Sequence, residues 1–245
     1  MIKLESIALE VTRRCNNNCS HCMRGNSQNL DLSVDIVDNF FSNNIKIIQD
    51  LCFSGGEPTL NPNIIAYIID KFIRNNIIVN NMVMVTNGRI FNENIIISLL
   101  RYKKIYQNSR IMINFSIDKY HKKIKKEIKE RYRNYSEFFE VDDYEIDDNT
   151  ILKTGNSDIG VDYSYKVDPI FFTYTEDELC IYNYLYLSAN GNFSTNGMGS
   201  YEDMDKLNLG NIKNNSLIDI VNKYGEAMLV DDSYKKLRIK KEKTL

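Results

Sequence analysis

Three cysteines within eight residues form the part of this sequence best suited to chemistry. Cys15, Cys19 and Cys22 are spaced four and three residues apart in the run CNNNCSHC. Thiolates on one short loop can bind one face of a compact iron–sulfur cluster, which usually has four Cys ligands. Because this loop supplies only three, one iron would keep an open position, as a metal that binds a substrate requires.

Structural zinc is the alternative occupant of this loop, with His21 or a distant cysteine as the fourth ligand. Zinc modules typically combine two short Cys/His pairs. The sequence has no second pair, and its two histidines are His21 and His121. Thiolate ligands also suit iron–sulfur clusters. The residues therefore favour a cluster and leave zinc as the alternative.

A second run with chemical potential is FSGGEP at residues 53–58. Gly55 and Gly56 would let the backbone approach a ligand without a Cβ clash. Glu57 offers a carboxylate and backbone acceptors that could meet an ammonium group. Pro58 fixes φ and makes the turn rigid. Taken alone, the same run is typical of an ordinary turn between a strand and a helix.

Together, the CNNNCSHC and GGEP runs resemble the radical S-adenosylmethionine (radical SAM) superfamily, and the resemblance covers residues 5–120. It implies an enzyme in which Cys15, Cys19 and Cys22 bind a [4Fe–4S] cluster and SAM is the cosubstrate. It also implies that the GGEP run holds the amino group of the methionine moiety. An electron from a small flavodoxin- or ferredoxin-like partner would cleave SAM to a 5′-deoxyadenosyl radical. That radical would take a hydrogen atom from an unidentified peptide, nucleotide or small metabolite.

Three further residues resemble positions at which family members contact SAM. His21 stands directly before Cys22, where an aromatic ring often packs near the adenine and can stack on it. Ser116 and Asp118 resemble ribose contacts, since hydroxyl and carboxylate side chains suit a diol. Asn87 is expected to face the same site. The alternatives are a surface or packing role for His21, a helix cap at Asp118 and a common Asn-Gly turn at Asn87.

These side chains need elements that bring them together, and the first half of the chain predicts strands alternating with helices. Apolar strands are predicted at residues 7–11, 51–53, 82–85 and 111–115, and helices from Ser33, Asn61 and Asn92 and, as a basic helix, over 120–132. Such a pattern predicts a parallel sheet covered by helices. The motifs follow the carboxyl ends of strands, where these sheets place their sites. The periodicity allows a barrel-like or an open sheet, and the resemblance implies an α/β partial (β/α)6 TIM-like barrel.

The second half of the chain is less regular. We expect an acidic surface loop at residues 140–150, an alternating strand at 159–165, a hairpin turning at Asn190-Gly191, a helix capped by Ser216 and a basic tail from Lys235. The hairpin and helix resemble a reduced SPASM-type extension. We therefore predict a radical SAM core at residues 1–178 and a small SPASM-like C-terminal extension at 179–245. Cys180 is the single cysteine of that extension, so no auxiliary cluster is expected.

Composition excludes several classes of function. The 245 residues carry 31 basic and 33 acidic side chains, a formal net charge of −2, so no global field favours nucleic acid or an anionic membrane. No apolar run approaches the roughly 18 residues of a membrane span, and the first residues lack the features of a signal peptide. We expect a cytoplasmic protein without membrane or nucleic-acid partners. The alternative function is a cluster- or zinc-binding regulatory or sensing protein without turnover.

Overall fold

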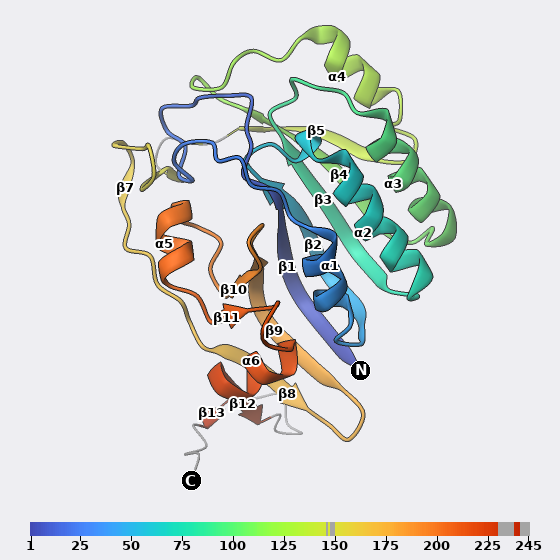
Figure 1. Ribbon diagram of the computed structural model, residues 1–245. Helices are drawn as coiled ribbons and strands as arrows, with labels where there is room; N and C mark the ends of the chain where they lie inside the picture. The colour runs from blue at the N-terminus through green and yellow to red at the C-terminus, as the bar shows by residue number, and fades with distance from the viewer. Residues whose placement is uncertain (146, 148–149, 230–237, 241–245) are drawn as a thin grey trace.

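A sheet of mainly parallel strands forms the centre of the computed structural model, which describes residues 1–145, 147, 150–229 and 238–240. Five strands pair in parallel in chain order: β1 (Ile2–Thr12), β2 (Ile45–Gly55), β3 (Ile78–Thr86), β4 (Arg110–Ile117) and β5 (Glu140–Glu145). A sixth, β9 (Leu179–Leu187), pairs in parallel with the other edge of β1. The sheet is twisted, and the carboxyl ends of these strands lie at the same end of the molecule (Figure 1).

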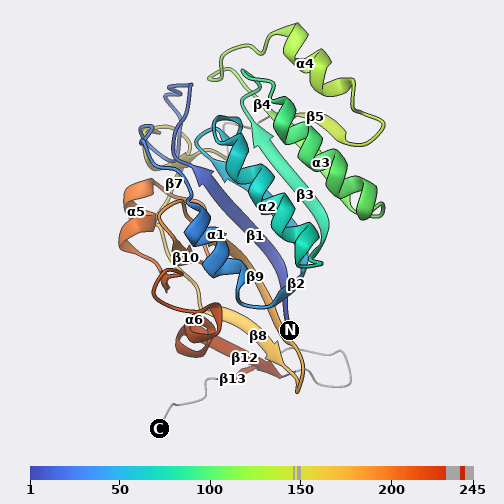
Figure 2. The same ribbon diagram turned by 45° about the vertical axis from the view of Figure 1, so that its right-hand side comes forward.

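The helices that connect the first four strands lie side by side on one face of the sheet (Figure 2). They are α1 (Val34–Phe41), α2 (Pro62–Arg74) and α3 (Glu93–Ile105); α4 (Lys126–Arg133) precedes β5. The Ser33 hydroxyl accepts a hydrogen bond from the Ile36 N–H, as expected of an N-cap. The apolar stripes predicted for the first three helices are buried, so their amphipathic patterns hold them against the sheet.

Successive side chains of the strands point to opposite faces of the sheet. In β2, Leu51 and Phe53 are buried beneath the helices, whereas Cys52 and Ser54 are partly exposed on the inner face. β3 and β4 alternate in the same way. The core therefore lies between the sheet and the helices, and the inner face stays accessible next to the strand ends.

The predicted α/β partial barrel is confirmed, but its sixth parallel strand does not come from a sixth βα unit. β9 takes that place on the opposite side of β1 and turns into the antiparallel strand β10 (Asn192–Ser194). This hairpin was predicted, and Gly191 in its turn has a φ of +91°, which favours glycine. Because β9 pairs with β1, the sheet is continuous across the predicted boundary at residue 178.

The acidic loop predicted at residues 140–150 is wrong in its first half, which forms β5. β5 pairs with β4, and most of its side chains are exposed. Within the described residues it is an edge strand. Such a strand needs no alternation of apolar and polar residues, and the acidic composition of β5 therefore led to the prediction of a loop.

Two other predicted elements are wrong in their extent. The strand predicted at residues 159–165 is limited to β7 (Val161–Asp162). Tyr165 packs instead against the segment after β10, where its hydroxyl donates to the Asn196 carbonyl at 2.8 Å. The basic helix predicted from residue 120 begins at Lys126, because the residues before it follow a turn around Asp118.

The remaining elements complete the C-terminal part of the chain: β6 (Leu152–Lys153), β8 (Ile170–Tyr174), α5 (Tyr201–Lys206), β11 (Gly210–Asn211), α6 (Leu217–Tyr224), β12 (Gly225–Leu229) and β13 (Arg238–Lys240). Ser216 caps α6 as predicted, in a reciprocal capping box with Asp219. The predicted basic tail lies outside the described residues except at 238–240. No helix in the described ranges combines the length and apolar character that crossing a membrane requires.

Candidate functional site

The cysteine loop, residues 13–30, leaves the carboxyl end of β1 and folds back on itself. At its base, the Arg13 N–H donates a hydrogen bond to the Leu30 carbonyl at 2.8 Å. Within it, the Cys22 N–H donates to the Cys19 carbonyl at 3.3 Å, which forms a tight turn between two candidate ligands. Cys15, Cys19 and Cys22 are free thiols and partly exposed. The loop therefore presents all three thiols at the carboxyl end of the sheet.

The three thiols influence one another electrostatically. Burial, together with the neighbouring Cys22 and Cys15, raises the pKa of Cys19 to about 11. Burial also raises the pKa of Cys15, although hydrogen bonds from the Asn17 N–H and the Asn87 amide oppose this shift. Several thiolates so close together repel one another. A bound metal group would remove this repulsion and release the protons.

The donor set fits an iron–sulfur cluster better than a single zinc ion. The three candidate ligands on the loop, Cys15, Cys19 and Cys22, are all thiols, and the His21 Nε2 lies 3.5 Å from the Asp118 carboxylate. Iron–sulfur clusters are held by cysteine thiolates.

The GGEP run meets the beginning of the cysteine loop through the backbone. The Gly56 N–H donates to the Thr12 carbonyl and the Glu57 N–H to the Arg14 carbonyl, both at 2.8 Å. A Cβ atom on Gly55 would overlap the Thr12 carbonyl oxygen, and one on Gly56 would overlap that of Arg14. The contact that requires these glycines is therefore with the chain itself. The close approach of a ligand, which we expected them to permit, stays a prediction.

Glu57 is 1% exposed and binds groups from two strand ends. Its Oε1 accepts from the Thr59 N–H at 3.1 Å, the Thr59 hydroxyl at 2.6 Å and the Thr86 hydroxyl at 2.7 Å. Its Oε2 accepts from the Asn87 N–H at 2.8 Å. Burial raises the pKa of Glu57, and these hydrogen bonds oppose the shift. Pro58 begins the short 3-10 helix η1 (Pro58–Leu60), which Glu57 caps.

Asn87 connects this arrangement to the cysteine loop. Its Nδ2 donates to the Asn16 Oδ1 at 2.8 Å and lies 3.9 Å from the Cys15 sulfur. Its Oδ1 accepts from the Arg89 N–H at 3.1 Å. The predicted position of Asn87 next to the cysteines is therefore found, in a turn that its own side chain stabilises.

Asp118 joins the end of β4 to the cysteine loop. Its Oδ1 accepts from the N–H groups of Tyr120 and His121, both at 2.8 Å. Its Oδ2 lies 2.7 Å from the His121 Nδ1 and 3.5 Å from the His21 Nε2. Burial opposes ionisation of Asp118, but the hydrogen bonds from His121 and Tyr120 outweigh it, so the pKa is lowered. The buried Ser116 precedes this cluster in β4.

The contacts of His21 agree with the packing role that was its alternative, whereas those of Asp118 differ from the helix cap that was its alternative. The buried His21 ring stacks on Tyr120, with centroids 4.6 Å apart. Asp118 does not cap α4, which begins eight residues later at Lys126; it stabilises the turn that follows it. The expected adenine and ribose contacts stay predictions. His21 lies in the cysteine loop, and Ser116 and Asp118 lie at the end of β4. The contact between Asp118 and His21 brings these two segments together.

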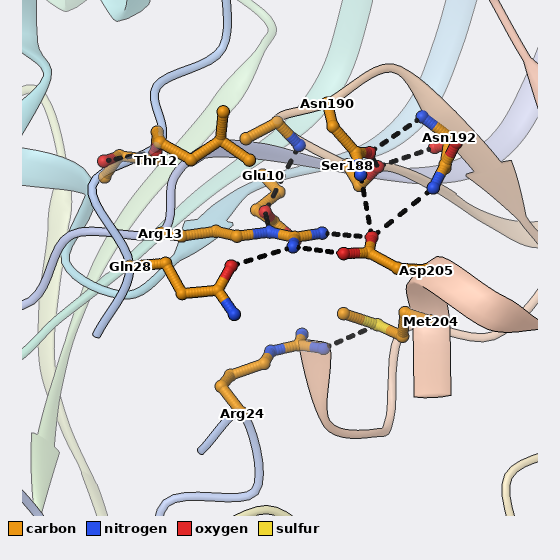
Figure 3. A network of polar contacts seen from close by, with 12 residues as sticks. Glu10, Thr12, Arg13, Arg24, Gln28, Ser188, Asn190, Asn192, Met204 and Asp205 are labelled. Atoms are coloured by element: carbon orange, nitrogen blue, oxygen red, sulfur yellow. Dashed lines mark hydrogen bonds and ion pairs between the residues drawn. The ribbon is translucent and has the colours of Figure 1, made fainter. Parts of the chain in front are cut away.

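The sequence reasoning missed the charged residues around the base of the cysteine loop. Arg13 is 1% exposed, and its Nε donates to the Glu10 Oε1 at 2.6 Å (Figure 3). Its two terminal nitrogens donate to Asp205 of α5. The local signal was a glutamate and an arginine three residues apart, directly after the apolar run Ile7-Ala8-Leu9 of β1.

Comparison with protein families identifies a match over most of the sheet. The sequence model of the radical SAM superfamily matches residues 9–143, which include the cysteine loop and β2 to β4. The uncharacterized protein MJ0907 of Methanocaldococcus jannaschii is 38% identical over 73 residues, which are 27% of this chain and 24% of that protein. The aligned part is thus about a quarter of this curated relative.

Two solved structures are similar to this chain over most of its length. One is described as native anSMEcpe with bound AdoMet and Cp18Cys peptide; it has a TM-score of 0.54 and 13% identity and covers 91% of this chain and 82% of its own. The other is Streptococcus suis SuiB bound to precursor peptide SuiA, with a TM-score of 0.47 and 11% identity over 93% of this chain and 65% of its own. The first likeness shows a shared fold.

Proposed function

The chain belongs to the radical SAM superfamily, and from this we propose that Cys15, Cys19 and Cys22 bind the cluster and that the GGEP run and its neighbours bind SAM. The superfamily uses a [4Fe–4S] cluster and SAM, and the chain is a radical SAM enzyme. When bound, the cluster would pass one electron from a reduced donor protein to SAM, and the C–S bond cleavage would give methionine and a 5′-deoxyadenosyl radical able to abstract hydrogen from the substrate.

The observation that carries this proposal is the junction between the cysteine loop and the GGEP run. Backbone hydrogen bonds join Gly56 to Thr12 and Glu57 to Arg14, directly before Cys15. A ligand on the open iron of the cluster would therefore lie next to the GGEP run. This proximity is what simultaneous binding of SAM to cluster and protein requires.

Acceptors at the junction suit the amino group of the methionine moiety. Glu57 Oε2 accepts one hydrogen bond, from the Asn87 N–H. A carboxylate oxygen can accept more than one donor, so this oxygen has capacity for an ammonium group. Glu57 would then hold SAM while its Oε1 stays bound to Thr59 and Thr86.

We assign the nucleoside part of SAM to the end of β4, where Asp118 lies next to His21 of the cysteine loop. There Asp118 carries two acceptor oxygens at the end of β4, and Ser116 adds a hydroxyl. His21 and Tyr120 form a stacked pair of flat rings at the same place. A ribose diol and an adenine suit these groups. The hydrogen bonds that fix Asp118 hold its carboxylate ready for this contact.

We propose a peptide as the first substrate class to test, because the solved anSMEcpe structure with this fold contains a bound peptide. The partly exposed inner face around Cys52 and Ser54 would be the surface that faces the substrate. A small flavodoxin- or ferredoxin-like protein would supply the electron. Nucleotides and small metabolites are the other classes for the same assay.

The test is anaerobic reconstitution with iron and sulfide, reduction with dithionite, and measurement of 5′-deoxyadenosine by mass spectrometry. We expect the wild-type protein to form 5′-deoxyadenosine from SAM and the Cys19→Ala variant to form none. Cys180→Ser is the matched control, since Cys180 lies beside Lys3 at the opposite end of β1 from the loop. A fully loaded, reduced wild-type protein that binds SAM without cleaving it would instead support a sensing role.

A further inference from the structure

Arg13 forms the centre of a buried network at the base of the cysteine loop (Figure 3). It stands two residues before Cys15 and is 1% exposed. Its Nε donates to Glu10 Oε1 at 2.6 Å, and its Nη1 donates to Gln28 Oε1 at 3.1 Å. The second oxygen of Glu10 accepts from the Tyr186 hydroxyl at 2.6 Å. Arg13 therefore has one orientation, fixed from β1, from β9 and from within the loop.

Asp205 of α5 completes the set of partners of Arg13. It accepts two parallel hydrogen bonds of 2.7 Å, from Nη1 and Nη2 of Arg13, although the two residues are 192 positions apart in the sequence. The Asn190 amide donates to Asp205 Oδ1 at 2.8 Å, and the Asn192 amide at 3.4 Å. Bidentate arginine–carboxylate pairs have a strict geometry, so α5 and the hairpin before it set the position of the guanidinium.

Arg24, which follows the three cysteines in the sequence, also binds α5. It stands two residues after Cys22 and is buried. Its Nη1 donates to the Gly199 carbonyl at 3.2 Å and lies 3.0 Å from the Met204 sulfur. Its own carbonyl accepts from the Tyr201 N–H at 3.2 Å. Both arginines that bracket the cysteines are thus bound to residues 199–205.

Tyr201 contacts both arginines, Arg13 before the three cysteines and Arg24 after them. While its N–H binds the Arg24 carbonyl, its ring lies beneath the Arg13 guanidinium, with the Arg13 Cζ 4.5 Å from the ring centroid. A cation over an aromatic face is attracted to it. α5 therefore spans the two ends of the segment that carries Cys15, Cys19 and Cys22. A shift of α5 would move those ends relative to each other.

We propose that α5 is a positioning element for the cluster ligands and that Asp205, acting through Arg13, fixes the geometry of the cysteine loop. The C-terminal extension then does more than close the barrel, because it helps to retain the cluster. Partners that orient metal ligands from outside the ligand set commonly change metal affinity or activity by about 10- to 100-fold when replaced. This inference rests on the proposed ligation by the three cysteines.

The test compares four reconstituted proteins: wild type, Asp205→Asn, Asp205→Glu and the control Glu202→Gln. Glu202 lies on the same helix and pairs with the exposed Lys206 at 2.6 Å. Three quantities are measured: iron release to a chelator, the EPR spectrum of the reduced cluster with and without SAM, and the thermal midpoint of the cluster-free protein. Asn190→Ala, which removes one amide donor to Asp205 and keeps the ion pair, is added in case Asp205→Asn does not fold.

We expect Asp205→Asn to release iron about tenfold faster than wild type and to change the EPR spectrum of the SAM-bound cluster. Asp205→Glu should partly restore the wild-type rate of iron release and the wild-type EPR spectrum. Asn190→Ala should increase the rate of iron release less than Asp205→Asn does. Glu202→Gln should match wild type in both measurements. Wild-type iron release and EPR spectra in Asp205→Asn would overturn the inference, whatever its thermal midpoint. If Asp205→Asn does not fold, wild-type iron release in Asn190→Ala would overturn it. Wild-type protein that takes up no iron would contradict the proposed function, and with it the inference.

Discussion

The buried carboxylate of Glu57 accepts a 2.8 Å hydrogen bond from the backbone N–H of Asn87, which lies 30 residues later at the end of β3. Asn87 in turn donates from its amide to Asn16 in the cysteine loop. The ends of β1, β2 and β3 are thereby joined through hydrogen bonds. The candidate site is one connected unit, and changes at its centre should affect both folding and ligand binding.

Replacing Glu57 with alanine should destabilise the protein as well as weaken SAM binding. The change removes the acceptor of buried donors from Thr59, Thr86 and Asn87. Leaving such donors unsatisfied costs about 1–3 kcal/mol per group. We expect a loss of about 2–4 kcal/mol in the free energy of unfolding of the cluster-free protein, measured by urea denaturation.

Glu93→Gln is the control for Glu57→Ala, because Glu93 is exposed in the first turn of α3. It should unfold at the same urea concentration as wild type. A Glu57→Ala protein with wild-type stability but no SAM binding would contradict the structural role and leave only the ligand role.

Replacing Gly56 with alanine should prevent stable cluster binding. Its Cβ would overlap the backbone of Arg14, directly before Cys15, and backbone cannot move aside as a flexible side chain does. Gly25→Ala is the control in the same loop. Its φ of +85° makes alanine strained by about 1–2 kcal/mol, but a Cβ there meets no atom closer than 3.8 Å. Iron content after reconstitution should fall in Gly56→Ala and be kept in Gly25→Ala; equal iron content would refute the steric account.

The elements that carry the motifs could be predicted because their signals are local. The apolar runs around Phe53 and Val83 marked strands, and Ser33 and Pro62 marked helix starts. The GGEP run follows a strand as expected. Local pattern also placed Cys15 and Asn87 at the same edge of the sheet, because the parallel strands β1 and β3 both end there.

Contacts between distant segments could not be predicted in this way. Nothing in the residues around Arg13 or Asp205 indicates the other, since their pairing depends on β9 joining the sheet beside β1. Edge strand β5 lacks the apolar alternation that identifies a strand. The close contact of the two glycines with Thr12 and Arg14 was not predictable for the same reason, because those residues belong to a different βα unit.

The two cysteines outside the loop should be dispensable for the cluster. Cys52 pairs in register with Ala8 in the body of the sheet, before the strand ends from which the cysteine loop leaves. Cys180 lies beside Lys3, far along β1 from the loop. Cys52→Ser and Cys180→Ser should keep the wild-type iron content per chain. Loss of iron in either variant would mean that the ligand set is wrong.

The Arg13–Asp205 pair should contribute stability that disappears in acid. Burial raises the pKa of Asp205, but hydrogen bonds from Arg13, Asn190 and Asn192 outweigh it, and the pKa is lowered. A carboxyl with a lowered folded pKa stabilises the protein above its unfolded pKa, about 3.9, and this contribution is lost as pH falls toward the folded value.

We therefore expect the thermal midpoints of cluster-free wild type and Asp205→Asn to differ by a constant amount from pH 7 to about pH 4 and to converge below it. Scanning calorimetry across this range measures the difference. Midpoints that converge between pH 7 and pH 5 would assign the effect to a group other than Asp205.

The central claim is that three thiols of one loop hold an iron–sulfur cluster whose open iron binds SAM. Its most direct test is the iron and sulfide content of the anaerobically reconstituted protein, combined with the EPR spectrum of the reduced cluster before and after SAM is added. We predict about four irons and four sulfides per chain, a spectrum that changes with SAM, and loss of both in the Cys15→Ala, Cys19→Ala and Cys22→Ala variants. Zinc without sulfide, or a spectrum that SAM leaves unchanged, would contradict the account.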